Sequence, residues 1–480
     1  MLGRLGCGFS NLFKPFFQVD RQERVKLALL TLTFFFVIAS YTLVKELKDS
    51  IFMTVVGRAY LPWVKIIAIV AMVPAIMLYS FLVDKMRRYQ LLALYSLMYG
   101  ILGLIFVYFI GHPTIGISNT ESSPYRLFGW LFYFFIEGYS PFIVGVFWAF
   151  ANSITSPGEA KKNYGLMVAG SKFGGLSVAL AAWYFLSPTV LNLSDTAKHQ
   201  VLGGASAILL LIVPIVILLL TKKVAGKYLH GYEAVYKLEK AKEQQEASST
   251  KAETNKVGIF SGLKLLMQHP YVLGIFGFIF FYEVSFAVLD YQRKCLIVDS
   301  SNGTADLSRE FFWQIFLVHL VGCLFSLIGT STLMRKFGER KCLMLVPIVS
   351  GLLFFYFIAV NTLNAVVIVF VGLRALNYGF SYPVRESLYI PTVKEIKFKS
   401  KSWIDAFGTK FAKGFGSSFN LFAVRVLSRF GAGAFLAVNG LFLLIIVGFW
   451  GLTAFLLGKR FQQAVDNNEV IGAEASSPRD

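Results

Sequence analysis

The chain is dominated by apolar segments long enough to cross a lipid bilayer. Runs of about 18 or more mostly apolar residues are typical of membrane-spanning helices. Twelve such runs lie at approximately 26–44, 63–83, 91–110, 127–151, 164–186, 201–220, 271–289, 311–330, 342–360, 363–382, 403–427 and 432–457. Because lipid offers no partner for backbone N–H and C=O groups, each run must form its hydrogen bonds internally. We therefore predict an all-α integral membrane protein with twelve transmembrane helices.

Composition agrees with this prediction. Charged residues make up 15% of the chain, whereas a soluble domain carries about 25%. The net charge is +19, from 46 Lys and Arg against 27 Asp and Glu. In a soluble protein this excess would suggest nucleic-acid binding. In a membrane protein it is expected from basic cytoplasmic loops, so we predict no nucleic-acid partner.

The basic connecting segments alternate along the chain, and this alternation predicts the topology. They lie at 84–88, 161–162, 221–270, 335–341 and 394–401, after spans 2, 4, 6, 8 and 10. Cytoplasmic loops are enriched in Lys and Arg, so both termini are expected in the cytoplasm. The segment 290–310, read as a loop with Arg293, Lys294 and Arg309, fits this alternation least well.

A polar central segment divides the chain into two sets of six spans. The expected parts are a cytoplasmic N-terminus (1–24), an N-terminal six-helix bundle (25–220), a cytoplasmic linker (221–270), a C-terminal six-helix bundle (271–457) and a cytoplasmic tail (458–480). The fifth span of each half contains a similar run, Gly170-Ser-Lys172-Phe and Gly408-Thr-Lys410-Phe. Related halves suit alternating access to a midplane site. The expected fold is similar to that of major facilitator transporters.

One carboxylate lies deep in the fourth span. Glu137 is seven residues from Trp130 and eleven from Trp148 in an otherwise apolar run. A charge at this depth costs about 3 kcal/mol, so it normally faces a water-filled cavity and a charged partner. We expect Glu137 to pair with a cation, with Lys48 and Lys413 as first candidates, and to couple transport. The alternative is a purely structural carboxylate neutralised by a neighbouring helix.

Cations are present in the first and fifth spans. Lys45, Lys48 and Asp49 share one helical face at the end of span 1. Lys48 is a candidate phosphate contact, and the alternative is an interfacial cluster whose side chains extend to the headgroups. In span 5, Lys172 lies within a run containing Gly170 and Gly174, a G-x-x-x-G pattern typical of close helix packing. Lys172 is expected to be a buried cation.

The seventh and tenth spans add further charged residues. Glu283 lies inside span 7, and Asp290 follows seven residues later on roughly the same face. Both are candidates for coupling, although Asp290 could instead mark the end of that helix. Span 10 contains Arg374 and, four residues on, Tyr378.

Span 11 combines two lysines with a ridge of small residues. Lys410 and Lys413 share a face beside Gly408, Ala412 and Gly416. The arrangement predicts a closely packed helix whose cations face a site. Lys acts on phosphate as a point charge and Arg as a bidentate fork.

Cations outnumber acids among these intramembrane residues. The candidate substrate contacts are Lys48, Glu137, Lys172, Arg374, Lys410 and Lys413, and the candidate coupling residues are Glu137, Glu283 and Asp290. The excess of positive charge predicts an anionic cargo.

Several other classes of protein lack support. The sequence contains no Walker-type, G-x-G-x-x-G or H-E-x-x-H motif, so transport driven by ATP hydrolysis is not expected. The four cysteines have no C-x-x-C spacing. We predict no enzyme activity, cofactor or metal site, and no export or transit peptide.

A specific run then indicates a family. Phe147-Trp-Ala-Phe-Ala-Asn152-Ser-Ile-Thr155 continues to Glu159-Ala-Lys161-Lys-Asn-Tyr164. It resembles the F-W-G-F-A-N-x-I-T…E-A-K-x-F-Y segment of the ATP/ADP translocases, the nucleotide transporters of plastids and intracellular bacteria. Two weaker matches follow the family's order. They are Tyr41 to Asp49, similar to Y-T-x-L-R-D-T-K-D, and Tyr389-Ile-Pro391 with 399–416, similar to Y-I-P…K-G-K-A-A-I-D…G-K-S-G-G.

The resemblance implies functional roles for three residues. The family's charged residues fall on Lys48, Glu137 and Lys413. Its fourth, the acid of the span 7 motif N-L-x-E-V-T-W-K, falls without a gap on Leu289, beside Asp290. Lys172 stands where the family usually has Asn.

The resemblance also implies a function. We expect a nucleotide transporter of a bacterial inner membrane, exchanging ATP for ADP by alternating access, with Tyr133 or Tyr378 as candidates to stack on the base. The alternatives are a proton-coupled symporter of another nucleotide or organic anion with the same fold, and a non-transporting receptor with a sealed core. The sequence gives no indication of oligomeric state.

Overall fold

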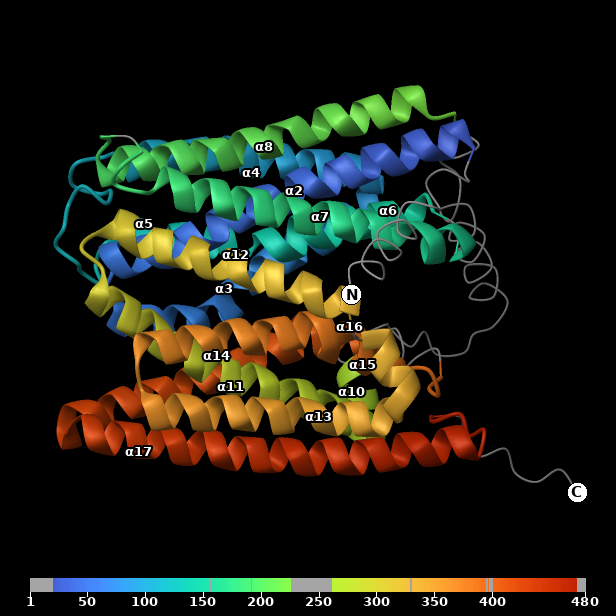
Figure 1. Ribbon diagram of the computed structural model, residues 1–480. Helices are drawn as coiled ribbons and strands as arrows, with labels where there is room; N and C mark the ends of the chain where they lie inside the picture. The colour runs from blue at the N-terminus through green and yellow to red at the C-terminus, as the bar shows by residue number, and fades with distance from the viewer. Residues whose placement is uncertain are drawn as a thin grey trace, which may run out of the picture. The chain divides into compact units, whose positions relative to one another are not determined.

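A computed structural model describes residues 20–155, 157–190, 192–225, 261–328, 330–393, 396 and 400–472 (Figure 1). The linker predicted at 221–270 lies largely outside these residues, as do most of the N-terminal segment and of the basic segment 394–401. The same holds for the last eight residues of the predicted tail, 473–480.

The described residues form helices and connecting turns. The first half contains α2 (Arg21–Val55), η1 (Arg58–Tyr60), α3 (Leu61–Lys85), α4 (Arg88–Ile110), α5 (Leu127–Glu137), the π-helical turn η2 (Ser140–Val144), α6 (Gly145–Ser153), α7 (Pro157–Phe185) and α8 (Asp195–Lys223). The second half contains α10 (Ser261–Gln268), α11 (Pro270–Ser300), α12 (Thr304–Ile328), α13 (Thr330–Val360), α14 (Leu363–Leu376), the π-helical turn η4 (Asn377–Ser381), α15 (Tyr382–Ser387), α16 (Lys401–Trp403), the π-helical turn η6 (Ile404–Gly408) and α17 (Thr409–Asp466). The predicted all-α membrane fold is confirmed.

Nine helical segments within the described residues are long and apolar enough to cross a membrane. The expected span 432–457 falls within α17, and the expected span 403–427 begins at the end of α16 and continues through η6 into α17. Gly431 interrupts α17 between these two spans with a φ of 82°. The expected span 363–382 is a 14-residue helix, α14, followed by a π-helical turn. The protein is a multi-pass membrane protein, and the count of twelve remains a prediction.

The chain divides into two compact units. Within the described residues, the first comprises 20–60, 70–225 and 301–316, and the second comprises 61–69, 261–300 and 317–472. Two helices are therefore shared. The first turns of α3 belong to the second unit, and the first turns of α12 belong to the first unit. In each half of the sequence it is the second long helix that is shared.

In the first unit, α2 packs on α7 and α8, and α4 packs on α8 (Figure 1). Gly174 of α7 makes close approach possible, since a Cβ there would lie 2.8 Å from the carbonyl oxygen of Phe35. The hydroxyls of Ser40 and Ser206 lie 2.8 Å apart between α2 and α8. This unit therefore combines tight glycine packing with hydrogen bonds between helices.

The second unit repeats this packing with different helices. α11 packs on α17 and α14, and α13 packs on α17. A Cβ on Gly416 would lie 2.9 Å from the carbonyl oxygen of Val284, and Ala412 is fully buried. The small residues predicted as a packing ridge thus lie against α11. The fifth span of each half packs on the first span of that half through glycines, as the similar runs at Gly170 and Gly408 suggest.

Candidate functional site

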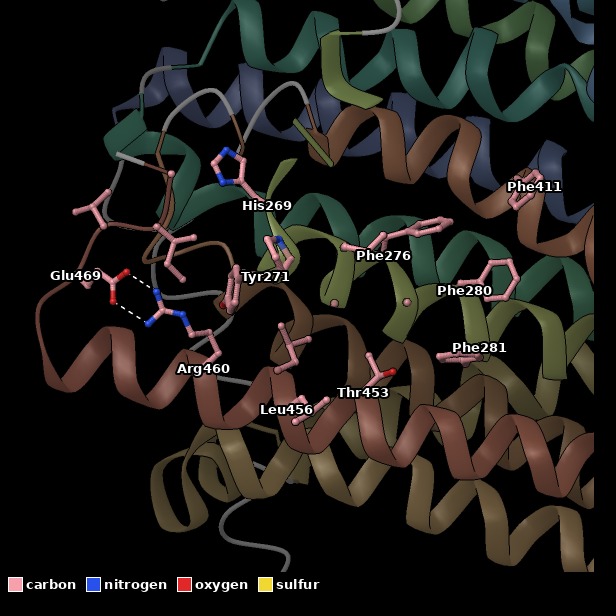
Figure 2. Close-up of a pocket in the computed structure, with 18 residues that line it drawn as sticks. His269, Tyr271, Phe276, Phe280, Phe281, Phe411, Thr453, Leu456, Arg460 and Glu469 are labelled. Carbon is pink, nitrogen blue, oxygen red and sulfur yellow. Dashed lines mark hydrogen bonds and ion pairs between the residues drawn. The ribbon is translucent and has the colours of Figure 1, made fainter. Parts of the chain in front are cut away.

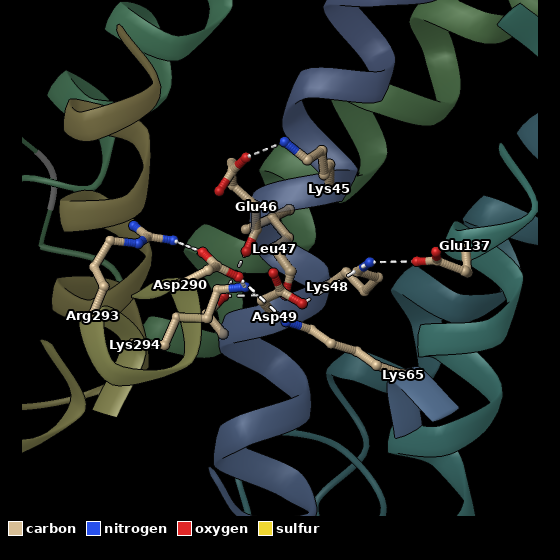
Figure 3. A network of polar contacts seen from close by, with 11 residues as sticks. Lys45, Glu46, Leu47, Lys48, Asp49, Lys65, Glu137, Asp290, Arg293 and Lys294 are labelled. Carbon is tan, nitrogen blue, oxygen red and sulfur yellow. Dashed lines mark hydrogen bonds and ion pairs between the residues drawn. The ribbon is translucent and has the colours of Figure 1, made fainter. Parts of the chain in front are cut away.

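Glu137 pairs with Lys48 in the first unit. The Lys48 Nζ lies 2.8 Å from Glu137 Oε2 (Figure 3). The same Nζ lies 4.1 Å from the centre of the Tyr133 ring. The Lys48 side chain is 9% exposed and the Glu137 side chain 31% exposed. Asp49 contributes a second carboxylate, 4.0 Å from the same Nζ. The expected partner of Glu137 is therefore Lys48, and the ammonium group is held by two acids and an aromatic face.

A break in the helix follows Glu137. α5 ends at this residue, and the π-helical turn η2 begins at Ser140. Pro141 has no N–H to donate to the Glu137 carbonyl four residues earlier, which explains the break. α14 shows the same arrangement, because Arg374 likewise lies three residues before a π-helical turn, η4, which begins at Asn377. Such turns are frequent at functional sites.

Asp290 is surrounded by three cations in the second unit. Its carboxylate accepts hydrogen bonds from Arg293 at 2.8 Å, from Lys294 at 2.7 Å and from Lys65 of α3 at 3.3 Å (Figure 3). All four side chains are at least four-fifths buried, with Lys65 the most exposed at 17%. One negative charge therefore faces three positive charges away from bulk water.

Two expectations about this region were wrong. The segment 290–310 is not a loop, since α11 continues to Ser300 and α12 begins at Thr304. Asp290 accordingly lies inside a helix and does not mark its end. Arg293 and Lys294 did not fit the pattern of basic loops because they lie three and four positions after Asp290 on the same helix, where both reach its carboxylate.

Arg374 lies among aromatic rings. Its guanidinium group is 4.1 Å from the centre of the Phe286 ring, and its Nη1 donates to the Tyr378 hydroxyl at 2.6 Å. Phe370 lies between this arginine and Arg293, whose guanidinium group is 3.8 Å from the Phe370 ring centre. Tyr378 is 43% exposed, whereas Tyr133 is 2% exposed beneath Lys48. Of the two tyrosines considered for base stacking, only Tyr378 offers an accessible ring.

Lys413 and Glu283 form a second, looser pair. Their nearest atoms are 3.7 Å apart, and the Lys413 side chain is 51% exposed while Glu283 is 15% exposed. Lys410, on the same helix, is half-buried. The lysines of α17 thus differ in exposure, with Lys413 the more accessible to a ligand.

Lys172 does not have the expected burial. Its side chain is exposed, whereas Gly174 is buried against α2. Gly170 meets Thr31 of α2 on the same face. Lys172 lies two residues from each glycine and so points away from the face that they pack. The prediction of a buried cation was wrong because the glycines, not the lysine, occupy the helix interface.

An apolar groove lies elsewhere in the second unit, with a volume of about 940 Å³ (Figure 2). Its walls include Phe276, Phe280 and Leu456. Arg460 lines it too, but donates to both carboxylate oxygens of Glu469, which lowers the pKa of that acid. Because this arginine is paired, the groove lacks the cationic character of the sites above, and we assign it no substrate.

The arrangement has a simple chemical consequence. Lys48, Lys65 and Arg374 contact carboxylates or aromatic faces inside apolar helices. An incoming polyanion could replace the carboxylates as partner of these cations, since phosphate oxygens form charge-assisted hydrogen bonds with both Lys and Arg. The residues that sequence reasoning missed are Lys65 and the aromatic pair Phe286 and Phe370. Lys65 was available as a charge inside the expected span 63–83, but it lies near the start of that span, where a lysine commonly extends to the headgroups. Phe286 and Phe370 resemble the many other phenylalanines of the spans.

Comparison with known proteins identifies the family. The family described as TLC ATP/ADP transporter matches residues 7–122 and 125–461. The chain is 22% identical over 464 residues to ADP,ATP carrier protein 3 of Rickettsia bellii (strain RML369-C), covering 85% of this chain and 89% of that protein. It is 23% identical over 526 residues to ADP,ATP carrier protein 1 of Chlamydia trachomatis, covering 98% and 95%.

Solved structures support the fold. A bacterial homologue of the iron transporter ferroportin, in an inward-facing state, matches with a TM-score of 0.61 at 9% identity, covering 91% of this chain and all of that one. A mutant of the nucleoside transporter NupG matches with a TM-score of 0.56 at 14% identity, covering 92% and 99%. The major-facilitator-like fold predicted from the sequence is thereby confirmed. From the match of its sequence along almost its entire length, the chain belongs to the TLC ATP/ADP transporter family.

Proposed function

We propose that the protein exchanges ATP for ADP across a bacterial inner membrane by alternating access, with both termini in the cytoplasm. The observation that carries the proposal is the Lys48–Glu137 pair, in which a mostly buried lysine inside a membrane span contacts a partly exposed carboxylate. The names of the relatives, ADP,ATP carriers, support the choice of nucleotide. The candidate phosphate contacts are Lys48 in the first unit and Arg374, Lys410 and Lys413 in the second. Lys172 is not among them, because its exposed side chain points away from the helix interface.

Glu137 has a distinct role in this proposal. Its carboxylate lies 2.8 Å from the Lys48 ammonium group and neutralises it. When a phosphate binds Lys48, the Glu137 carboxylate loses its partner. Its negative charge then carries a desolvation penalty in apolar surroundings. Substrate binding thus changes the charge balance of the span, and this change couples occupancy to the conformational cycle. Glu283 does the same for Lys413 in the second unit.

Asp290 is the acid that we assign to the family's span 7 motif. In N-L-x-E-V-T-W-K the lysine follows the acid by four positions. Asp290 and Lys294 have the same separation and are in contact at 2.7 Å. If the ungapped match is shifted by one residue, the motif's acid falls on Asp290 and its lysine on Lys294. We therefore propose Asp290, rather than Leu289, as the functional acid.

The planar guanidinium group of Arg374 is expected to donate two hydrogen bonds to phosphate while it stacks on the Phe286 ring. Arg374→Lys keeps the charge but loses the fork and the stacking, so the KM for nucleotide should rise about tenfold with little change in protein amount. The measurement is the concentration dependence of labelled ATP uptake. Arg340→Lys is the matched control, because Arg340 also lies over a ring, Phe455, at 5.6 Å. Equal KM values for both variants would remove Arg374 from the site.

The proposed function is tested by an uptake screen. Bacterial cells that express the protein are supplied with labelled ATP, ADP, GTP, UTP, CTP or NAD, with and without a protonophore. The proposal predicts uptake of ATP and ADP that persists when the proton gradient is collapsed. Uptake of another nucleotide or anion that is lost with the protonophore would support the proton-coupled symporter instead. Absence of uptake and of counter-exchange for all six compounds would reject a nucleotide carrier.

A further inference from the structure

The first turns of α12 are hydrogen-bonded to α2 at two points, one helical turn apart. The hydroxyls of Thr304 and Thr54 lie 3.1 Å apart, and the hydroxyls of Ser308 and Ser50 lie 2.6 Å apart. Ser50 and Ser308 are buried with no exposed surface. The four-residue spacing on both helices means that the two contacts lie on matching faces.

The same turns of α12 are also bound to α8. The carboxylate of Asp195 accepts a hydrogen bond from the backbone N–H of Ala305 at 2.9 Å, at the start of α12. His199, four residues later on α8, is fully buried, and its Nε2 lies 2.8 Å from the hydroxyl oxygen of Ser308. Ser308 is therefore in contact with a histidine on one helix and a serine on another.

The hydrogen-bond partners of His199 allow both protonation states of the ring. Its Nδ1 lies 2.7 Å from the backbone oxygen of Asp195, which can only accept, so Nδ1 carries a hydrogen in either state. In the neutral ring, Ser308 donates its proton to Nε2. In the charged ring, Nε2 donates to Ser308, Ser308 donates to Ser50, and Ser50 donates to the carbonyl oxygen of Leu47 at 3.1 Å. Protonation thus reverses the direction in which the Ser308 hydroxyl donates, and the chain of hydrogen bonds then runs from His199 through Ser308 and Ser50 to the Leu47 carbonyl.

Other charged groups on these turns have their own contacts. They are Asp195 and Lys198 on α8, Asp306, Arg309 and Glu310 on α12, and Glu46 and Asp49 on α2. Lys198 donates to the carbonyl oxygens of Leu186 and Ser187 at the end of α7. Arg309 lies over the Trp183 ring at 5.2 Å. Burial disfavours the charged form of the His199 ring most strongly, Asp195 favours that form, and Lys198 opposes it, so the ring is expected to take up a proton only at acid pH.

We propose that His199 is a proton-binding site, and that a proton bound there stabilises the contacts of the first turns of α12 with α2 and α8. The proposal assigns His199 no contact with nucleotide, and it goes beyond the exchange function. α12 begins in the first compact unit and continues into the second. The proton therefore controls the stability of the hydrogen bonds that hold the first turns of α12 against α2 and α8. Acid pH is expected to stabilise them.

Hydrogen–deuterium exchange of the purified, full-length protein tests this directly. Amides in the first turns of α12, after correction for the intrinsic pH dependence of exchange, should be about five- to tenfold better protected near pH 5.5 than near pH 8, the effect expected of one added hydrogen bond. His199→Gln should remove this difference. His112→Gln, which alters a histidine of the loop before α5, should leave it unchanged.

A second variant covers the case in which His199→Gln does not fold. Ser308→Ala keeps the histidine but removes the link to Ser50, so the pH difference in protection should shrink to less than about half. A difference of wild-type size in either variant would overturn the proposal, as would equal protection at both pH values in the wild-type protein. Because the readout does not involve nucleotide, its outcome is independent of whether the protein exchanges ATP for ADP.

Discussion

Lys48→Ala is expected to abolish nucleotide transport. The substitution removes a cation 2.8 Å from Glu137 and leaves that acid without its principal partner in a membrane span. Loss of one member of a buried charge pair typically costs about 2–5 kcal/mol in binding, so uptake should fall at least about thirtyfold. Stability should fall by about 2 kcal/mol, at the low end for a buried pair because Glu137 is partly exposed.

A charge exchange separates the functional role of this pair from its structural role. In the double variant Lys48→Glu with Glu137→Lys, a pair of opposite charges is retained but the cation moves to α5. The thermal midpoint in detergent should recover most of the loss seen in Lys48→Ala, whereas ATP uptake should remain absent. Lys45→Ala, which removes a more exposed lysine that pairs with Glu46 about one turn earlier, is the matched control and should retain transport. Recovery of uptake in the double variant would show that the pair is structural.

Asp290→Asn is the second change with a large expected effect. It leaves Arg293, Lys294 and Lys65 facing one another around a neutral amide. Because each is mostly buried, the loss of their shared carboxylate should destabilise the protein by about 3–5 kcal/mol and eliminate transport. The measurement is the amount and thermal midpoint of protein extracted from membranes, followed by uptake where protein remains.

Two further variants identify the cause of that loss. Lys65→Met in the Asp290→Asn background removes one of the three repelling charges, so part of the lost stability should return. Glu283→Gln on the same helix alters an acid whose partner Lys413 is 3.7 Å away and half-exposed, so its thermal midpoint should change by less than the equivalent of about 1 kcal/mol. Equal destabilisation by Asp290→Asn and Glu283→Gln would contradict the special role of the three-cation cluster.

The fold could be predicted from the sequence because lipid leaves few alternatives. Long apolar runs must become helices, and the expected runs fall on helices throughout the described residues. Close packing was predictable from the small residues around Gly174 and Gly416, because glycine spacing on a helix is a local property. Gly431, with a φ of 82°, interrupts α17 between the two expected spans 403–427 and 432–457, at the end of the short connecting segment that the sequence predicted there.

The candidate site was only partly predictable. A charge inside an apolar run is conspicuous, so Lys48, Glu137 and Arg374 could be identified one by one. Their partners depend on which helices meet, and this is not visible in a single sequence. Lys65 lies near the start of its helix and Phe370 in an ordinary apolar run, yet they contact Asp290 and Arg293. Lys172 is the opposite case: its charge is conspicuous in the sequence, but it lies outside the helix interface because Gly170 and Gly174 pack there.

The central claim is that this chain exchanges adenine nucleotides, and counter-exchange by the purified protein tests it most directly. Proteoliposomes are loaded with unlabelled ADP, and labelled ATP is added outside. The account predicts rapid entry of label that depends on internal ADP, persists when no proton gradient is present, and is absent with Lys48→Ala. Entry of label at the same rate into empty vesicles and ADP-loaded vesicles would contradict exchange. Absence of entry under both conditions, with folded wild-type protein, would contradict the account as a whole.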